Sequence, residues 1–328
     1  MQVSNADGVH VLKFVMSEMT GLKFFVPLIE EGNRRGIDST IFFGRSNKYS
    51  NTLQHIESLK QISEKHRFEI VDLSKNSSAG GDILFTVEGA WRDLISNKRA
   101  TVSLYCSSDF TASYDKYVNE VDHVVLGSKF VADLYGKKSD KNIYLGSPKF
   151  DVSLDRDTIL EKYKLCASKK RVTIFYPRLR DIALSRVEDV IKTFHNMRYD
   201  VILKTRGKDP FVPRHEALVE NSMYDRSWYP STSMELISVS DLIFNFSSTV
   251  IEETTALRKP VINFHVKPFL PSFNFLYEYD FVRNVSDIRD LPDHIKHFEN
   301  YVPANFEEAN SKLFDTTASS KSILDMLL

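Results

Sequence analysis

The sequence predicts an α/β protein built from two doubly wound domains, and two observations lead to this prediction. The chain has 328 residues, about twice the length of one ordinary domain. In both halves, short runs rich in β-branched and aromatic residues alternate with longer stretches of helical periodicity, as in parallel sheets with helices on both faces. We therefore expect one domain over residues 1–150, a second over 151–304 and a C-terminal helix over 305–328.

Strands and helices alternate throughout the first half. The first expected strand, 9–16, is followed by a helical pattern from Gly21 to Arg35, and Gly36 is placed to end that helix before a strand at 39–43. Further strands are expected at 68–73, 82–87, 100–105 and 123–126, and further helices at 52–65 and 129–135. This order predicts repeated βαβ units.

The same pattern begins again after Gly146-Ser147-Pro148, so we place the domain boundary near Asp151. The second half has expected strands at 171–176, 200–204, 241–246 and 260–264, with helices at 157–165, 187–197 and 250–257. Because no Gly/Ser linker separates the halves, we expect the domains to face each other across a cleft. Ligands would then bind outside the carboxyl ends of the strands. The segment 305–328 is compatible with a helix that packs back on the first domain.

Composition excludes several function classes. Lys+Arg total 43 and Asp+Glu 44, a net charge of −1, so the chain lacks the overall positive field of nucleic-acid-binding proteins. Cys106 and Cys166 form no CxxC pair and the nine histidines form no cluster, which disfavours a disulfide framework and a metal site. No apolar run reaches the ~20 residues needed to span a bilayer. We expect a cytoplasmic protein without nucleic-acid partners, and peripheral membrane contact stays open.

The segment 240–262 carries the most informative pattern for binding. It reads as strand, hydroxyl-rich turn, acidic helix and strand. Ser247, Ser248 and Thr249 fall at the expected helix start, where hydroxyls, backbone N–H groups and the helix dipole favour a phosphate group. One turn further, Glu253 is placed to accept hydrogen bonds from a ribose diol. The alternative is an ordinary N-cap followed by first-turn acids.

This segment resembles the nucleotide-binding part of GT-B glycosyltransferases, which consist of two Rossmann-like domains. Within them it is most similar to the CDP-glycerol glycerophosphotransferases of teichoic acid synthesis, whose pattern is aspartate, apolar strand, paired serines, acidic helix and Lys-Pro before a strand. Four other pieces match that family in order: Gly146-Ser147-Pro148-Lys149-Phe150-Asp151, Phe175-Tyr176-Pro177-Arg178-Leu179-Arg180-Asp181, Val201-Ile202-Leu203-Lys204-Thr205-Arg206 and Tyr229-Pro230. The resemblance covers about residues 123–264 and implies a GT-B fold with the donor in the second domain.

Four cations follow strands of the second domain: Arg178, Arg180, Lys204 and Arg206. A guanidinium group can hold two phosphate oxygens at once, so these side chains suit the leaving group of a nucleotide-activated donor. The resemblance implies that no metal and no other cofactor is needed. The alternative is surface pairing with Asp181 and Asp209. We expect Arg180 to contribute most.

The first domain departs from the family pattern. The teichoic acid polymerases carry a Trp-His-Gly segment whose histidine resembles the acceptor-activating base, whereas the equivalent region here reads Leu104-Tyr105-Cys106-Ser107-Ser108-Asp109-Phe110. An acceptor hydroxyl still needs a proton acceptor within hydrogen-bond reach. The candidate bases are three carboxylates that follow expected strands, and each has a turn or cap role as its alternative: Glu18, Glu88 and Asp109.

The sequence therefore predicts a metal-independent, nucleotide-sugar-dependent glycosyltransferase of surface polysaccharide or glycan assembly. Its partners would be a nucleotide-sugar donor and a glycan or lipid-linked acceptor. Three alternatives stay open: a CDP-glycerol-type polyol-phosphate transferase, a nonhydrolysing sugar-nucleotide epimerase and a noncatalytic nucleotide-sugar binder. The pair Glu252-Glu253 resembles the acidic pair of the epimerases, but their His-Arg-Glu-Asn segment is absent.

Overall fold

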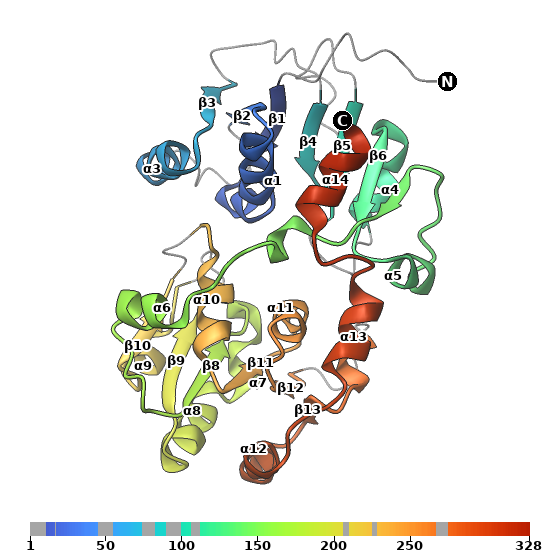
Figure 1. The fold of residues 1–328 in the computed structure, drawn as a ribbon. Coiled ribbons are helices and arrows are strands. Elements are labelled where there is room, and N and C mark those ends of the chain that lie inside the picture. Colours follow the sequence, from blue (N-terminus) through green and yellow to red (C-terminus); the bar gives the residue numbers. More distant parts are fainter. Residues whose placement is uncertain are drawn as a thin grey trace, which may run out of the picture. The chain divides into compact units, whose positions relative to one another are not determined.

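The computed structural model describes residues 11–16, 18–44, 55–73, 83–89, 100–105, 112–205, 210–224, 228–266 and 275–328. The chain divides into two compact units. Unit 1 comprises Met1–Val152 together with Lys312–Leu328, and unit 2 comprises Ser153–Ser311. Each unit is an α/β layer structure with its own parallel sheet (Figure 1).

The described residues of unit 1 form a seven-stranded sheet in the order β3-β2-β1-β4-β5-β6-β7, and every strand pair is parallel. The strands are β1 (Val11–Met16), β2 (Asp38–Phe43), β3 (Glu69–Asp72), β4 (Ile83–Val87), β5 (Ala100–Leu104), β6 (His123–Leu126) and β7 (Asn142–Tyr144). The strand order reverses between β1 and β4, the position at which ligands of doubly wound sheets bind.

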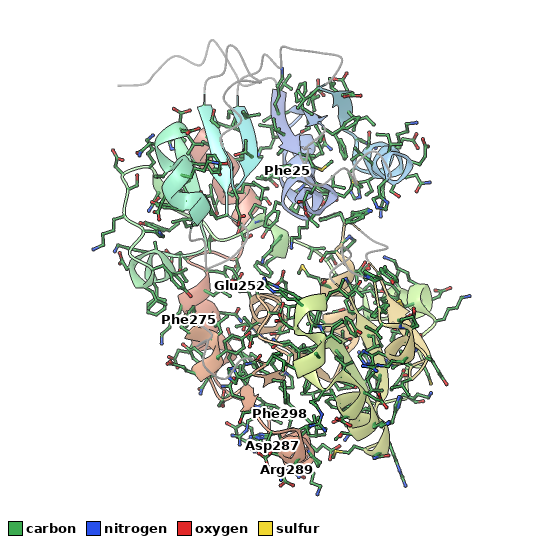
Figure 2. All side chains as sticks on the ribbon, turned by 180° about the vertical axis from the view of Figure 1, so that it is seen from behind. Phe25, Glu252, Phe275, Asp287, Arg289 and Phe298 are labelled. Carbon is green, nitrogen blue, oxygen red and sulfur yellow. The ribbon has the colours of Figure 1, made fainter. Side chains whose placement is uncertain are left out.

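Helices cover the sheet of unit 1. They are η1 (Met19–Gly21), α1 (Leu22–Arg34), α3 (Ile56–His66), α4 (Ala112–Tyr117), η3 (Val118–Glu120), α5 (Lys129–Leu134) and η4 (Pro148–Phe150). Phe25 of α1 packs on Phe14 of β1, with ring centroids 5.1 Å apart (Figure 2). Gly36 has φ 74°, a left-handed conformation that suits glycine, and it follows the helix end as the sequence predicts.

Unit 2 repeats this topology with one strand fewer in its described residues. The sheet order is β10-β9-β8-β11-β12-β13, again with parallel pairs throughout. The strands are β8 (Arg171–Phe175), β9 (Asp200–Lys204), β10 (Asn221–Met223), β11 (Leu242–Asn245), β12 (Val261–Phe264) and β13 (Val282–Val285). Its strand order reverses between β8 and β11, so this pair marks the expected ligand edge of unit 2.

Two apolar layers enclose the sheet of unit 2. One joins the strands to α8 (Val187–Asn196) and α12 (Leu291–Asn300), and the other joins them to α6 (Arg156–Tyr163) and α10 (Thr232–Val239). The other helices of the unit are η5 (Leu179–Asp181), α7 (Ile182–Ser185), α9 (Pro213–Glu216), α11 (Ile251–Ala256), η6 (Phe275–Glu278), η7 (Ile288–Asp290) and α13 (Phe306–Leu313), whose last residues belong to unit 1. Among the described residues, none of the helices is long and apolar enough to cross a membrane.

The segment 305–328 forms two helices rather than the expected single one. The second, α14 (Ser319–Leu327), packs against α1 in unit 1. Between the helices, Phe314 packs on Phe150, with ring centroids 4.6 Å apart. The same segment is held at the start of α5, because the Asp315 carboxylate accepts a hydrogen bond from the Lys129 backbone N–H at 3.0 Å.

Candidate functional site

The carboxyl ends of β8 and β11 place several of the predicted donor-binding residues on neighbouring strands of unit 2. Ile174 of β8 lies beside Phe244 of β11 in the sheet register. Beyond these positions, β8 leads into the segment that contains Arg178 and Arg180, and β11 leads into the turn Ser247–Thr249. Because these strands are adjacent and parallel, the topology brings both segments to one edge of the sheet.

The turn after β11 exposes hydroxyl groups at this edge. Ser247 and Thr249 are exposed, and in the described part of the chain neither hydroxyl has a protein hydrogen-bond partner. Ser247 has φ 51°, a left-handed conformation that is uncommon for serine and is found in tight turns and binding loops. The Ser248 hydroxyl accepts a hydrogen bond from the Val250 N–H at 3.4 Å, so Ser248 closes the turn that precedes the helix.

The helix after the turn is shorter than expected. It runs from Ile251 to Ala256, and Val250 rather than a serine is its N-cap residue. A helix of this length has a small dipole, so a phosphate group at the turn would depend mainly on direct hydrogen bonds. Glu253 lies in its first turn and is 8% exposed. Its neighbour Glu252 is 3% exposed and lies on the same short helix (Figure 2).

A polar network holds the turn in place. The Asn263 side chain accepts a hydrogen bond from the Ser247 N–H at 2.8 Å and donates one to the Asn284 side chain at 3.0 Å. The Asn284 amide donates to the Tyr277 carbonyl at 2.9 Å, and the Tyr277 hydroxyl donates to the Ser248 carbonyl at 3.0 Å. His265 joins the network, since its Nε2 lies 3.1 Å from the Asn284 Oδ1. The network connects the ends of β11, β12 and β13 with η6.

Arg178 and Arg180 are exposed at the end of β8. Arg180 makes a weak ion pair with Asp181, at 3.8 Å, which leaves its guanidinium group accessible. The segment begins at Tyr176, whose hydroxyl lies 2.7 Å from His215 Nδ1 and accepts a hydrogen bond from the Val212 N–H at 3.2 Å. Burial raises the pKa of Tyr176, while burial and then the neighbouring Arg214 lower the pKa of His215.

Lys204 differs from the two arginines. Its side chain is 1% exposed, and its ammonium group donates a hydrogen bond to the Thr205 carbonyl. A direct phosphate contact would require the ammonium group to leave this carbonyl. Arg206, the fourth predicted cation, lies outside the described residues.

In unit 1, two of the three candidate carboxylates lie at the position where the strand order reverses. Glu18 follows β1 and Glu88 follows β4, and these strands are neighbours in the sheet. Both side chains are half-buried, and Glu18 accepts a hydrogen bond from the Thr20 hydroxyl at 3.4 Å. Glu88 has φ 48°, and its N–H continues the ladder to the Leu104 carbonyl at 3.0 Å. Asp109 lies outside the described residues.

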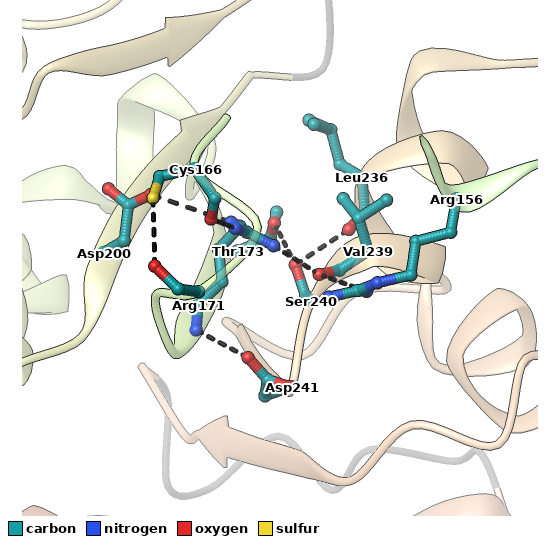
Figure 3. Close-up of polar contacts among 10 residues, drawn as sticks. Arg156, Cys166, Arg171, Thr173, Asp200, Leu236, Val239, Ser240 and Asp241 are labelled. Carbon is teal, nitrogen blue, oxygen red and sulfur yellow. Dashed lines mark hydrogen bonds and ion pairs between the residues drawn. The ribbon is translucent and has the colours of Figure 1, made fainter. Parts of the chain in front are cut away.

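A separate polar cluster occupies the amino ends of the strands of unit 2 (Figure 3). The Arg171 side chain is fully buried and donates hydrogen bonds to the carbonyls of Val239, at 2.8 Å, and Cys166. Its backbone N–H donates to Asp241 at 2.7 Å, and its guanidinium group lies 3.6 Å from the Asp200 carboxylate. The cluster fixes the starts of β8, β9 and β11 at the edge opposite the candidate site, so we assign it a structural role.

The described residues contain no group of three or more His, Cys, Asp or Glu side chains that could hold a metal ion. The candidate donor edge instead presents hydroxyls, amides and arginines. This set of groups suits a phosphorylated ligand that also carries hydroxyl groups.

Solved structures share this fold over nearly the whole chain. A putative UDP-N-acetylglucosamine 2-epimerase from Listeria monocytogenes is 12% identical, with 97% of this chain and 95% of that chain covered and a TM-score of 0.61. The wall teichoic acid polymerase TagF, in a structure with CDPG, is 14% identical, with 97% and 88% covered and a TM-score of 0.65. A glycosyltransferase from Rickettsia africae is 15% identical, with 98% of both chains covered and a TM-score of 0.54.

The chain has the GT-B fold. This confirms the fold predicted from the sequence, two doubly wound α/β domains. No family model matches the sequence, and no curated protein matches it. At these identities the shared GT-B fold places no individual site residue.

Sequence reasoning missed the asparagines of the network behind the turn. Asn263 and Asn284 lie in β12 and β13, side by side in the sheet register. One signal was available, because a polar residue within the run Val-Ile-Asn-Phe is unusual for a strand buried on both faces. The contact of His265 with Asn284 arises from strand pairing, which the sequence does not display.

Proposed function

We propose that the protein is a nucleotide-sugar-dependent glycosyltransferase that binds its donor at the carboxyl edge of the unit 2 sheet. The observation that supports this most is the pairing of accessible arginines after β8 with the hydroxyl-bearing turn after β11, at the reversal of strand order. Doubly wound sheets bind nucleotides at this position. The GT-B fold is consistent with the proposal, and the fold alone does not select the reaction.

In this proposal, Arg178 and Arg180 neutralise charge on the leaving nucleotide, and the hydroxyls of Ser248 and Thr249 bind its phosphate. Glu253 binds the ribose. A carboxylate of unit 1, Glu18, Glu88 or Asp109, accepts the proton that the acceptor hydroxyl loses as it attacks the donor sugar. The acceptor is a glycan or a lipid-linked molecule.

A thermal-shift panel tests donor binding. CMP, CDP, UDP, GDP and dTDP are added in turn, and a nucleotide that binds only the folded protein raises its melting temperature. The double variant Ser248→Ala/Thr249→Ala should fold but lose most of this rise, because it lacks two hydroxyl donors beside the phosphate. The matched control is Ser238→Ala, which removes a hydroxyl bonded to a backbone carbonyl in α10. A panel without any rise would contradict the proposal.

The second candidate is a sugar-nucleotide epimerase. It is favoured by the Listeria structure and by an epimerase from Neisseria meningitidis bound to UDP-GlcNAc, of which 99% is covered at 14% identity and a TM-score of 0.60. An epimerase converts its sugar nucleotide without an acceptor, whereas a transferase releases free nucleotide only as the sugar reaches an acceptor. NMR analysis of UDP-GlcNAc incubated with the protein alone separates the two activities.

A polyol-phosphate transferase is distinguished by its donor. This alternative is suggested by the TagF structure with CDPG. Such a transferase would consume CDP-glycerol rather than a nucleotide sugar, so donor consumption tests it. A noncatalytic binder would bind nucleotide but consume no donor with any acceptor.

A further inference from the structure

We propose that the carboxamide of Asn245 is a ligand-recognition group of the unit 2 site and that it hydrogen-bonds a hydroxyl group of the donor. The proposal rests on the proposed function and adds a residue and a ligand chemistry to it. Asn245 is the last residue of β11 and precedes the turn Ser247–Thr249 by two positions. Its side chain is 0% exposed, and among the residues that the structure describes neither Nδ2 nor Oδ1 has a hydrogen-bond partner.

The neighbouring asparagine shows that this lack of partners is specific to Asn245. Asn245 and Asn263 are paired in the sheet register, so their side chains lie on the same face. Asn263 is also 0% exposed, yet its oxygen accepts from the Ser247 N–H and its nitrogen donates to Asn284. Two buried amides therefore lie side by side under one turn, and the described residues provide hydrogen-bond partners for only one of them.

An unsatisfied buried amide costs folding free energy, and it needs an explanation when it occurs beside a candidate site. The position of Asn245 supplies an explanation. The satisfied partner, Asn263, holds the Ser247 backbone, so the face shared by both side chains is the one that lies behind the hydroxyl-bearing turn. A ligand group that completes Asn245 would gain the hydrogen bonds that the protein leaves unmade.

The chemistry of the amide selects a hydroxyl group. A carboxamide presents a donor and an acceptor next to each other, and a hydroxyl can both accept and donate. A phosphate oxygen accepts only, so it would leave Oδ1 without a partner. Phe244 is paired with Ile174 of β8, so the next residue of β8, Phe175, continues this register toward Asn245, and its side chain supplies no charge and no competing polar group. The hydroxyl can belong to the ribose or to the transferred sugar of the donor.

Contact with the ligand requires a local movement, because the amide is fully covered. Ser247 is the residue of the adjoining turn whose backbone lies in the left-handed region, with φ 51°, and the turn can relax there. The proposal therefore includes a shift of this turn when the donor binds.

The variant Asn245→Leu removes the amide and keeps the branched shape of the side chain. Its melting temperature should equal or exceed that of the parent, because an unpaired buried polar group is replaced by an apolar one. Calorimetry with UDP and with UDP-N-acetylglucosamine, or with the matched pair for the base selected by the panel, should show binding weakened about tenfold, the loss of one hydrogen bond. Equal losses for both ligands assign the contact to the ribose, and a loss only for the sugar nucleotide assigns it to the transferred sugar.

The matched control is Thr101→Val in unit 1. Thr101 is also 0% exposed, and it lies near the amino end of β5. Its hydroxyl has no hydrogen-bond partner within the described part of the chain. This variant should likewise keep or raise the melting temperature, but nucleotide binding should stay unchanged.

Several outcomes would overturn the proposal. If Asn245→Leu binds both ligands as tightly as the parent, Asn245 does not contact the donor, while the proposed function stands. If it binds them normally and melts at a lower temperature, the amide has a structural role instead. If the parent binds no nucleotide, the proposed function and this proposal fail together.

A second measurement reports ligand binding in the parent protein, and the variants serve only to assign its signals. In ¹H–¹⁵N spectra the side-chain amide signals of Asn245, assigned by their absence in Asn245→Leu or Asn245→Ser, should shift when UDP-N-acetylglucosamine is added. Signals that stay unchanged while other resonances report binding would reject the contact.

Discussion

Glu88 combines a carboxylate with a backbone conformation that an ordinary side chain rarely adopts. Its φ is 48°, and it is the first residue after β4. In the turn that begins there, the Thr86 hydroxyl donates a hydrogen bond to the Gly89 carbonyl at 2.5 Å, and the Gly89 N–H donates one to the Ser103 hydroxyl at 3.4 Å. These bonds hold the turn, and residues strained in this way cluster at functional sites. Ser247 occupies the corresponding place in unit 2, after the fourth strand of a sheet with the same strand order.

The variant Glu88→Gly separates strain from chemistry. Glycine adopts a positive φ without penalty, so we expect a gain of about 1 kcal/mol in the free energy of unfolding, measured by urea denaturation. If Glu88 is the base, Glu88→Gly and Glu88→Gln should both lose donor turnover while nucleotide binding persists. A stable Glu88→Gly variant with parental turnover would limit Glu88 to a structural role.

The base itself is tested by single amide substitutions of the three unit 1 carboxylates. Glu18→Gln is the first choice, because the loop after the first strand of a doubly wound domain lies at the ligand edge. The variant of the true base should lose turnover by about 10²–10⁴-fold and keep nucleotide affinity, measured by donor consumption and calorimetry. Near-parental turnover in Glu18→Gln, Glu88→Gln and Asp109→Asn alike would show that the base lies elsewhere.

His215 predicts a dependence of stability on pH. Burial beside Tyr176 lowers its pKa, so the folded protein binds a proton less readily than the unfolded chain. The stabilisation from neutral His215 is present above the ordinary histidine pKa and is lost as the pH falls below it. His215→Gln should reduce this loss in urea denaturation series between about pH 5 and 8. The control His195→Gln replaces an exposed histidine of α8 and shows the effect of removing a histidine elsewhere in unit 2.

At the scale of elements, α14 depends on a cap that comes from a distant part of the chain. The Asp151 carboxylate accepts hydrogen bonds from the backbone N–H groups of Ser319, at 3.2 Å, and Ser320, at 2.5 Å. Ala318, the N-cap residue, supplies no side-chain acceptor. Gly146 allows this close approach, since a Cβ atom there would lie 2.3 Å from the Ser319 hydroxyl.

Asp151→Ala should therefore lower the free energy of unfolding by about 1–2 kcal/mol, the usual cost of a lost N-cap. Burial raises the pKa of Asp151, so its contribution to stability is larger at acid pH and falls as the pH rises through the pKa of the folded protein. Denaturant unfolding at two pH values measures both effects. The control is Asp155→Ala, which removes a local cap on the Thr158 N–H in α6. Asp155 is not buried, so this variant should not show the pH dependence that burial gives to Asp151.

The sequence predicts the central strands well and misses three of the four edge strands. Six expected strands of unit 1 and four of unit 2 overlap strands of the structure, and all of these except β3 lie in the interior of a sheet. Long apolar runs identify strands that are covered on both faces. The missed strands are β7, β10 and β13, and all three lie at sheet edges. They have three or four residues and include polar side chains, so no apolar run marks them.

In the candidate site, too, the sequence reveals only features that a local run of residues marks. Hydroxyls at Ser247–Thr249 and arginines at the end of β8 could be found, because a motif concentrates them within a few residues. The burial of Lys204 could not be predicted in this way. A lysine at the end of a strand gives the same sequence pattern whether its ammonium group points to solvent or donates to the Thr205 carbonyl. Asn245 was missed because only strand register shows that it pairs with Asn263.

For the whole molecule, we expect catalysis without a metal. Arg178 and Arg180, with Arg206, would neutralise the leaving phosphate. Donor turnover should survive EDTA, and Arg180→Ala should lower the rate most among the single cation variants. Loss of turnover in EDTA with recovery on addition of Mg²⁺ or Mn²⁺ would show that the metal-free assignment is wrong.

The division of the chain also sets an order of events on the ribosome. Unit 2 is continuous in sequence, whereas unit 1 includes a segment, Lys312–Leu328, that is synthesised after all of unit 2. Until that segment emerges, the nascent first unit lacks the helix that covers α1 and the backbone that packs on Gly127. Domains usually fold in the order of their synthesis. Here the later unit can finish first, and the earlier one exposes apolar surface of α1 for longer, which makes it the part of the nascent protein most in need of a chaperone.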